Sequence, residues 1–212
     1  MSCGVLGGTF NPVHVAHLRL AETAREALGL SRVLFVPAAR PPLKDEDVAF
    51  ARDRLEMVRL ATASNAAFEV LDLELRRPGP SYTVDTLREI REARGDERLW
   101  FLLGSDALRE LHRWNRADDL LRLTSLAVAC RPGSQAPLLD LLPEPFRGQY
   151  RPGPHGLEHE SGTELRAIPF PALEVSASEI RSRRSSGRSI RYLVPDAVLD
   201  YIEKHGLYGG DA

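Results

Sequence analysis

Short apolar runs alternate with longer amphipathic stretches along the chain. The apolar runs predict strands at about 3–6, 32–36, 67–74, 99–103, 125–130 and 165–169. The stretches between them predict helices at about 12–28, 50–63, 83–94, 105–112, 116–123, 177–185 and 195–205. Strands that alternate with helices favour an α/β fold, with a doubly wound parallel sheet and a helical C-terminal end. Ligands of such sheets bind beyond the carboxyl ends of the strands, where the strand order reverses.

One segment, residues 131–164, departs from this alternation because it is rich in proline and glycine and has few helix signals. We predict an irregular excursion here, with a short helical turn at about 138–142, inside a single domain of residues 1–212. Histidines and acids gather in this excursion, but their spacing matches no standard metal site. We interpret them as a mobile polar loop; they are His155, Glu158, His159 and Glu160.

Composition narrows the classes of function. The chain has 28 basic and 30 acidic residues and a net charge of −2, so it lacks the basic footprint of proteins that bind long nucleic acid. No apolar run approaches the length of a membrane span, and no signal-peptide pattern is present. The two cysteines, Cys3 and Cys130, have neither metal nor redox spacing. A reducing compartment is therefore favoured, and we expect a cytoplasmic protein.

The first predicted strand leads into the most informative segment, Gly7 to His17. Its glycines allow a ligand to come close, while Asn11 as N-cap and Pro12 at the first helical position predict a helix start. His14 and His17 would share one face of the first turns, where the helix dipole attracts anions. The segment therefore predicts a site for nucleotide phosphates. The alternative is a plain strand–turn–helix with two exposed histidines.

The glycines do not form the dinucleotide-binding fingerprint. The chain reads Gly4-Val5-Leu6-Gly7-Gly8 instead of Gly-x-Gly-x-x-Gly, and no acid ends the second predicted strand. An oxidoreductase is therefore disfavoured.

A second helix start lies at residues 175–181. Ser176 and Glu179 form a capping box, with Val175 and Ile180 as its hydrophobic staple. A well-made helix start explains these residues but not Arg181, whose guanidinium matches the geometry of phosphate. We therefore expect a second phosphate contact here.

These two segments carry a resemblance to a known family. Gly-Gly-Thr-Phe-x-Pro-x-His-x-x-His resembles the first signature of the nucleotidylyltransferase superfamily, and 175–181 resembles its second. Segments from Gly7 to near Tyr208 are similar to the bacterial nicotinate-nucleotide adenylyltransferase family. The resemblance implies a Rossmann-like topology with catalytic residues His14, His17 and Arg181. It implies ATP-binding residues Gly7, Gly8, Thr9, Phe10, His14, His17, Gly104, Asp106, Arg131, Ser176, Ser178, Ile180 and Arg181.

The chain departs from this family's pattern at five positions. Val175 stands where isoleucine is usual and Ser178 where threonine is usual. Asn11 stands where aspartate is common, Ala16 where glycine is common and Ala177 where serine is common. None of these changes removes a phosphate donor except the hydroxyl lost at Ala177.

Three further segments match the narrower family and imply how the acceptor is chosen. The acceptor-binding residues would be Lys44, Tyr82, Thr83, Asp106 and Trp114. Backbone N–H groups at Tyr82 and Thr83 would take the nicotinate carboxylate, Asp106 would accept ribose hydroxyls, and Trp114 would stack on the pyridine ring. Three of these assignments have a plain alternative. Lys44 would be a surface lysine, Tyr82 and Thr83 would belong to an ordinary helix capped by Thr83 or Ser81, and Trp114 would be a core residue of an amphipathic helix.

The implied reaction transfers the adenylyl group of ATP to nicotinate mononucleotide in NAD biosynthesis, giving nicotinate adenine dinucleotide and pyrophosphate. Mg²⁺ would arrive with ATP, so no protein metal ligand is assigned. Another adenylyl- or cytidylyltransferase, such as phosphopantetheine adenylyltransferase, is the nearest rival, and a nucleotide sensor without turnover is the second. The sequence leaves open a homo-oligomer and the degree of preference for nicotinate over nicotinamide mononucleotide.

Overall fold

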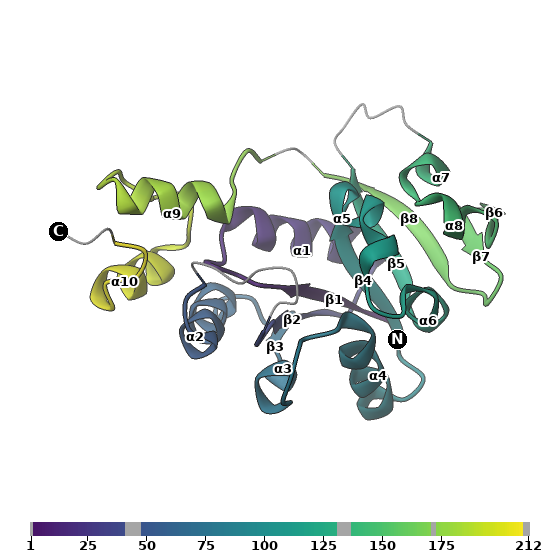
Figure 1. Ribbon diagram of the computed structural model, residues 1–212, viewed down its shortest axis with the longest axis horizontal. Helices are drawn as coiled ribbons and strands as arrows, with labels where there is room; N and C mark the ends of the chain where they lie inside the picture. The colour runs from purple at the N-terminus through teal and green to yellow at the C-terminus, as the bar shows by residue number, and fades with distance from the viewer. Residues whose placement is uncertain (1, 41–47, 131–136, 171–172, 210–212) are drawn as a thin grey trace. The chain divides into compact units, whose positions relative to one another are not determined.

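The computed structural model describes residues 2–40, 48–130, 137–170 and 173–209. Within them, eight strands form one sheet in the order β3-β2-β1-β4-β5-β8-β7-β6 (Figure 1). The strands are β1 (Ser2–Gly8), β2 (Arg32–Pro37), β3 (Phe68–Val70), β4 (Arg98–Gly104), β5 (Ser125–Cys130), β6 (Tyr150–Gly153), β7 (Gly156–His159) and β8 (Glu164–Pro169).

The described residues also form helices, which are labelled in Figure 1. They are α1 (Val15–Leu28), α2 (Ala51–Thr62), α3 (Leu73–Arg76), α4 (Thr83–Arg94), α5 (Ser105–Arg109), η1 (Leu111–Arg113), α6 (Ala117–Leu123), α7 (Leu138–Leu141), α8 (Glu144–Arg147), α9 (Ala177–Ser185) and α10 (Asp196–Lys204). None of them is long and apolar enough to cross a membrane.

The sheet is parallel through its centre. β1 pairs with β4, β4 with β5 and β5 with β8 in parallel, whereas β6, β7 and β8 pair antiparallel. The order β3-β2-β1-β4-β5 is that of a doubly wound sheet, and it reverses between β1 and β4. The predicted α/β class and doubly wound sheet are therefore confirmed, with an antiparallel hairpin added at one edge.

The chain divides into two compact units. The first unit comprises Met1–Leu6, Ala21–Val33 and Tyr82–Ala172. The second unit comprises Gly7–Leu20, Leu34–Ser81 and Leu173–Ala212.

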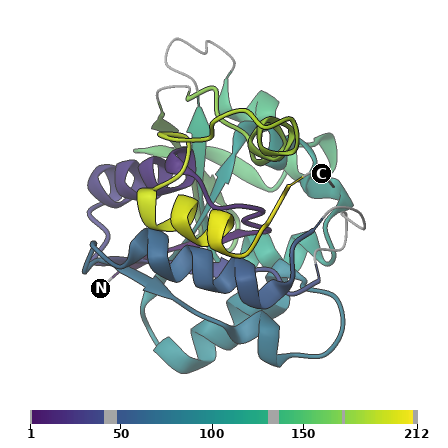
Figure 2. The ribbon, with the colours of Figure 1, turned by 90° about the vertical axis from the view of Figure 1, so that its left-hand side faces the viewer.

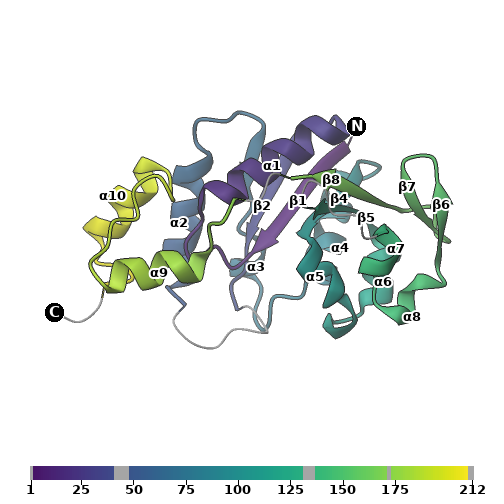
Figure 3. The same cartoon turned by 90° about the horizontal axis from the view of Figure 1, so that it is seen from above.

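The core of the first unit lies around β4 and β5. Residues 99–103 and 126–128 are buried along consecutive positions, as expected for central parallel strands covered on both faces. α5 packs on both strands, and α4 packs against α6 (Figure 3). This packing explains why both strands read as unbroken apolar runs in the sequence.

The core of the second unit includes a helix pair, α2 and α10. Met57 and Val58 of α2 are buried, as are Val198 and Ile202 of α10. The two helices pack together, and Figure 2 shows α10 lying along α2. The C-terminal helix is thus held by an apolar stripe that recurs at helical spacing.

The prediction of one strand over 67–74 was wrong in its second half. β3 ends at Val70, and the same apolar run continues into the short helix α3. Asp72 precedes α3 and forms an ion pair with Arg76, 2.6 Å apart at i,i+4 spacing. That pair favours a helical turn over an extended strand.

Residues 137–164 are ordered elements, in contrast to the irregular excursion predicted from their composition. α7 and α8 follow Pro137 and Pro143, and β6 and β7 form a hairpin that extends the sheet. Gly156 in the hairpin has φ +154°, and an added Cβ would lie 2.4 Å from the carbonyl oxygen of Leu165. Proline and glycine therefore act here as helix starts and as a hairpin turn. The preceding residues 131–136 lie outside the described residues.

One histidine of the predicted mobile polar loop is packed in the structure. His159 is 2% exposed, and its ring nitrogens lie 2.8 Å from the Ser161 hydroxyl and 2.9 Å from Oε1 of Gln149. Burial lowers the pKa of His159. This histidine has a structural role, because both of its nitrogens have hydrogen-bond partners.

Candidate functional site

The first motif forms a turn before its helix starts. α1 begins at Val15, so the predicted start at Pro12 with Asn11 as N-cap was wrong. The amide oxygen of Asn11 instead accepts hydrogen bonds from the Ala49 N–H (3.1 Å) and the Tyr208 hydroxyl (2.8 Å). Because these tertiary partners occupy that oxygen, it does not cap the helix.

His14 and His17 form a reciprocal pair at the start of α1. The His14 N–H donates to Nδ1 of His17 (3.2 Å), while the His14 carbonyl accepts from the His17 N–H (3.0 Å). Their ring centroids lie 3.7 Å apart. His17 thus takes the place that glutamate holds in a capping box. Since its Nδ1 accepts, a neutral His17 carries its proton on Nε2, which can donate to a phosphate oxygen.

Burial sets the charge of His14. The residue is 6% exposed, and its Nδ1 atom is buried and makes no hydrogen bond within the described part of the chain. Burial lowers the pKa of His14 from 6.5 to about 4. His14 is therefore neutral at pH 7 in the free protein. A buried nitrogen without a partner is costly unless a ligand supplies one.

The helix terminus itself offers fewer donors than the sequence suggested. The Val15 N–H, in the first turn of α1, donates to the carbonyl of Leu193 (3.0 Å). This N–H is therefore not available to a phosphate.

Gly8 of the first motif makes room for an aromatic ring. Phe10 has φ +48° and is 2% exposed, and an added Cβ on Gly8 would lie 3.3 Å from its ring. The Phe10 ring packs edge-on against His17, with centroids 5.0 Å apart. Gly8 therefore serves the packing of Phe10, and only the backbone of Phe10 is available to a nucleotide.

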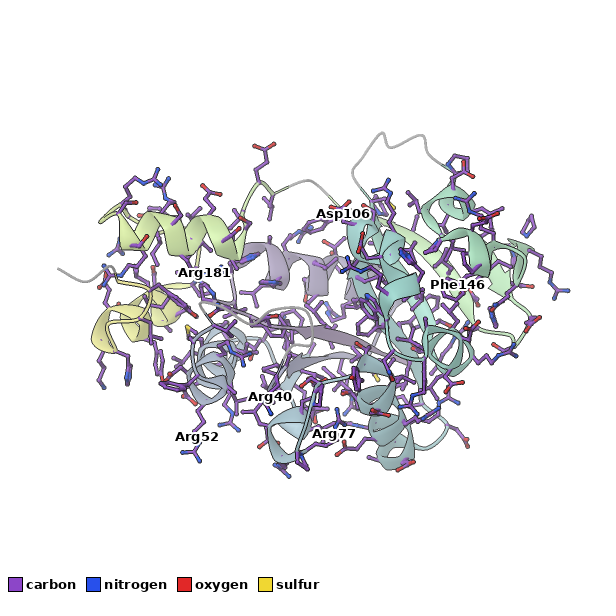
Figure 4. The ribbon with its side chains drawn as sticks, viewed as in Figure 1. Arg40, Arg52, Arg77, Asp106, Phe146 and Arg181 are labelled. Atoms are coloured by element: carbon purple, nitrogen blue, oxygen red, sulfur yellow. The ribbon has the colours of Figure 1, made fainter. Side chains whose placement is uncertain are left out.

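The second motif is a capped helix that contacts the first motif. Ser176 Oγ accepts from the Glu179 N–H (3.1 Å), which confirms Ser176 as the N-cap of α9, and its hydroxyl lies 3.1 Å from that of Ser178. Arg181 Nη1 donates to the main-chain carbonyl of Asn11 (3.0 Å), 170 residues away in the sequence. Figure 4 shows Arg181 on α9. The two predicted phosphate segments thus meet in the second unit.

Ile180 was predicted among the ATP-binding residues, but its side chain is fully buried. It anchors α9, so only its backbone could contact a nucleotide.

A pocket of about 1040 Å³ opens beside Arg181 in the second unit. This volume is at the upper end of the usual range for ligand sites, about 300–1,000 Å³. Among the described residues that line it none is acidic, and it contains three arginines and three serines: Arg40, Arg54, Arg181, Ser178, Ser182 and Ser185. The pocket is therefore suited to an anion.

Sequence reasoning missed Arg40 and Arg54 in this pocket. Arg54 is 1% exposed and lies on the apolar face of α2, at helical spacing from Val58 and Ala61. A charged residue on an apolar stripe was the available signal, because a buried charge needs specific partners.

The first unit contains the predicted residues at the end of β4. An added Cβ on Gly104 would meet no atom within 4 Å, so the backbone there is open to a ligand. The side chain of Asp106 is 98% exposed and pairs with Arg109 at 3.0 Å (Figure 4). Trp114 is half-buried and packs edge-on against Phe101, with centroids 5.9 Å apart.

The predicted cap of α4 by Thr83 or Ser81 was wrong. Tyr82 occupies the N-cap position of α4 and makes no side-chain cap hydrogen bond, while Thr83 is the first helical residue. Ser81 belongs to the second unit, where its hydroxyl accepts from the N–H groups of Ala39 (3.1 Å) and Arg40 (3.3 Å). It therefore supports the loop after β2.

Two predicted residues, Lys44 and Arg131, lie outside the described residues. Among the residues that are described, no group of three or more His, Cys, Asp or Glu side chains is arranged to hold a metal ion.

Known proteins resemble this chain over most of its length. The Cytidylyltransferase-like family matches residues 5–183. A Pelobacter propionicus protein is 47% identical over 98% of both chains, and a Geobacter sulfurreducens protein is 45% identical over 100% of both. Both are named probable nicotinate-nucleotide adenylyltransferase.

Solved structures agree in fold. Plasmodium falciparum nicotinic acid mononucleotide adenylyltransferase complexed with NaAD has a TM-score of 0.75 at 18% identity, covering 98% of this chain and 97% of that one. The same enzyme complexed with APC has a TM-score of 0.72 at 17% identity, covering 98% and 96%. From its match over most of its length and its close relatives, the chain belongs to the Cytidylyltransferase-like family and, within it, to the nicotinate-nucleotide adenylyltransferases.

Proposed function

We propose that this chain transfers the adenylyl group of ATP to nicotinate mononucleotide, producing nicotinate adenine dinucleotide and pyrophosphate for NAD biosynthesis. The observation that carries the proposal is that the two motifs meet in the second unit. There Arg181 donates to the carbonyl of Asn11, in the motif that contains the His14–His17 pair, and Arg181 lines a pocket with no acidic residue among those described. The curated relatives with that enzyme name support the choice of reaction.

The chemistry needs no protein nucleophile. The 5′-phosphate oxygen of nicotinate mononucleotide attacks the α-phosphorus of ATP in line, and the bond to pyrophosphate breaks. Protein groups then contribute by holding two anions together and by stabilising charge that develops on the transferred phosphate. We assign this work to Nε2–H of His17, to the guanidinium of Arg181 and to His14. The hydroxyls of Ser176 and Ser178 would bind the triphosphate.

Magnesium enters as part of the MgATP substrate. The groups assigned to the phosphates are imidazoles, a guanidinium and hydroxyls, which suit phosphate oxygens but are not the carboxylates that Mg²⁺ prefers. The ion would accordingly be held by phosphate oxygens and water, and it would offset charge on the leaving pyrophosphate.

The first unit contains the proposed acceptor residues other than Lys44, which belongs to the second unit. Backbone N–H groups of Tyr82 and Thr83, at the N-terminus of α4, would bind the nicotinate carboxylate. The exposed carboxylate of Asp106 would accept ribose hydroxyls, and Trp114 would stack on the pyridine ring. Lys44 keeps its proposed role at the acceptor phosphate, and Arg131 its proposed role near the adenylyl group.

We also place the reaction in the cytoplasm, with small molecules as the partners. Cys3 and Cys130 are both free thiols, which accords with a reducing compartment.

One assay tests the proposed reaction. Purified protein with ATP and Mg²⁺ is supplied in parallel with nicotinate mononucleotide, nicotinamide mononucleotide or phosphopantetheine, and pyrophosphate release is measured. We expect release chiefly with nicotinate mononucleotide. Turnover with phosphopantetheine alone would favour the rival transferase. ATP binding without turnover on any acceptor would favour a nucleotide sensor.

A further inference from the structure

Arg54 is a buried cation to which the proposed chemistry assigns no role. It is 1% exposed, and its guanidinium donates to three main-chain carbonyls: Nε to Ala49 (2.9 Å), Nη1 to Thr9 (2.7 Å) and Nη2 to Ala39 (3.1 Å). Arginine stays charged even when buried, and its planar fork fixes the direction of each acceptor. A cation taken out of water in this way needs such partners.

The three carbonyls belong to three different segments of the second unit. Thr9 follows β1 in the first motif, Ala39 follows β2 and directly precedes Arg40 of the pocket, and Ala49 lies just before α2. One side chain therefore joins the two loops that leave neighbouring strands to the start of a helix.

The hydrogen bond from Arg54 to the Thr9 carbonyl supports the position of His17 through Phe10. Phe10 follows Thr9, adopts the left-handed backbone conformation at φ +48° and packs its ring edge-on against His17. A residue other than glycine keeps a positive φ only where the surrounding structure holds it there. By fixing the Thr9 carbonyl, Arg54 fixes the peptide plane that leads into Phe10.

The hydrogen bond from Arg54 to the Ala49 carbonyl supports the position of Arg181 through Asn11. The Ala49 N–H donates to the amide oxygen of Asn11, and Arg181 donates to the main-chain carbonyl of that same asparagine. Tyr208 donates to the amide oxygen as well, so Asn11 is held from several sides.

We infer that Arg54 is a positioning residue for adenylyl transfer. It sets the geometry of both His17 and Arg181 and does not itself touch the reacting groups. The inference rests on the proposed function for its activity measurements. Its structural content is that one guanidinium joins the segments 9–11, 39–40 and 49–50, two of which are also joined by the hydrogen bond from the Ala49 N–H to Asn11.

Substitutions that separate charge from geometry test this role. Arg54→Lys keeps the positive charge but loses the fork, so kcat at saturating substrates should fall about 10- to 100-fold, as small misplacements of reacting groups cause. Arg54→Met also removes the charge and should raise KM for ATP in addition. Arg52→Met is the matched control, because Arg52 is exposed on the same helix and points away from it (Figure 4). All rates are compared well below each variant's unfolding temperature.

Hydrogen exchange followed by mass spectrometry supplies a readout independent of substrate. In Arg54→Lys, amides of residues 9–11, 13–14, 38–40 and 49–51 should exchange faster, whereas those of β4 and β5 keep their protection. A kcat within about twofold of the parent protein would overturn the inference, and so would faster exchange spread evenly over the chain, which indicates only lost stability. If the parent protein itself is inactive, the proposed function fails while the exchange pattern still decides the role of Arg54.

Discussion

At the scale of single residues, the imidazole of His14 couples stability to pH. Its neutral form is favoured in the folded protein, with a pKa of about 4 against 6.5. The unfolded chain therefore binds more protons between these values, and the stability contributed by His14 is complete above pH 6.5 and is lost as the pH falls toward 4. This difference corresponds to about 3 kcal/mol.

The expected outcome is a steep loss of unfolding free energy between pH 6.5 and 4, which becomes shallower in His14→Gln. Denaturant titrations at several pH values measure it, with the exposed His155→Gln as the control. An equally steep loss in His14→Gln would contradict the assignment to this buried ring.

His17 has two nitrogens with separate tasks, and two substitutions distinguish them. In His17→Asn the amide oxygen can still accept from the His14 N–H, but the distal donor is gone. We expect near-normal stability and a loss of kcat of about 10²-fold or more, as for other preorganised donors. His17→Gln, whose amide reaches the Nε2 position, should retain more activity. A change confined to KM would mean that His17 binds only ground-state substrate.

At the scale of elements, the N-terminus of α9 combines a cap with a proposed phosphate contact. Ser176→Ala removes the hydroxyl that accepts from Glu179 and should lower the free energy of unfolding by about 1 kcal/mol. Ser176→Asp keeps a good cap but adds a negative charge where we place the triphosphate. It should preserve stability and raise KM for ATP at least tenfold. An unchanged KM in Ser176→Asp would remove this helix start from the ATP site.

At the scale of the whole molecule, the proposed ATP-binding residues other than Gly104, Asp106 and Arg131 belong to the second unit, whereas the proposed acceptor residues other than Lys44 belong to the first. Substitutions in each should therefore affect one substrate more than the other. Trp114→Ala should raise KM for nicotinate mononucleotide about tenfold and leave KM for ATP unchanged, whereas Trp114→Phe retains a stacking ring and should change little. Ser178→Ala should show the reverse selectivity. Steady-state kinetics with one substrate saturating decides between these outcomes.

The sequence was a good guide to features that depend on neighbouring residues. The helices 83–94 and 177–185, the strand 125–130 and the cap at Ser176 follow from hydrophobic periodicity and capping, which act within a few residues. The family resemblance likewise rests on short motifs. The prediction of a strand over 67–74 was wrong because one apolar run spans β3 and α3. The prediction of an irregular excursion was wrong because proline and glycine also begin helices and close hairpins.

The roles of Asn11, Phe10 and Arg54 were decided only by the tertiary structure. Asn11 reads as an N-cap in the sequence, yet its partners lie 38 and 197 residues away, and Arg54 reaches a carbonyl 45 residues away. Local patterns cannot encode such contacts, since they depend on which loops the sheet order brings together. The sequence by itself thus determined the α/β class and the two motifs that we propose to bind phosphate, whereas long-range packing decided which buried groups hold these motifs in place.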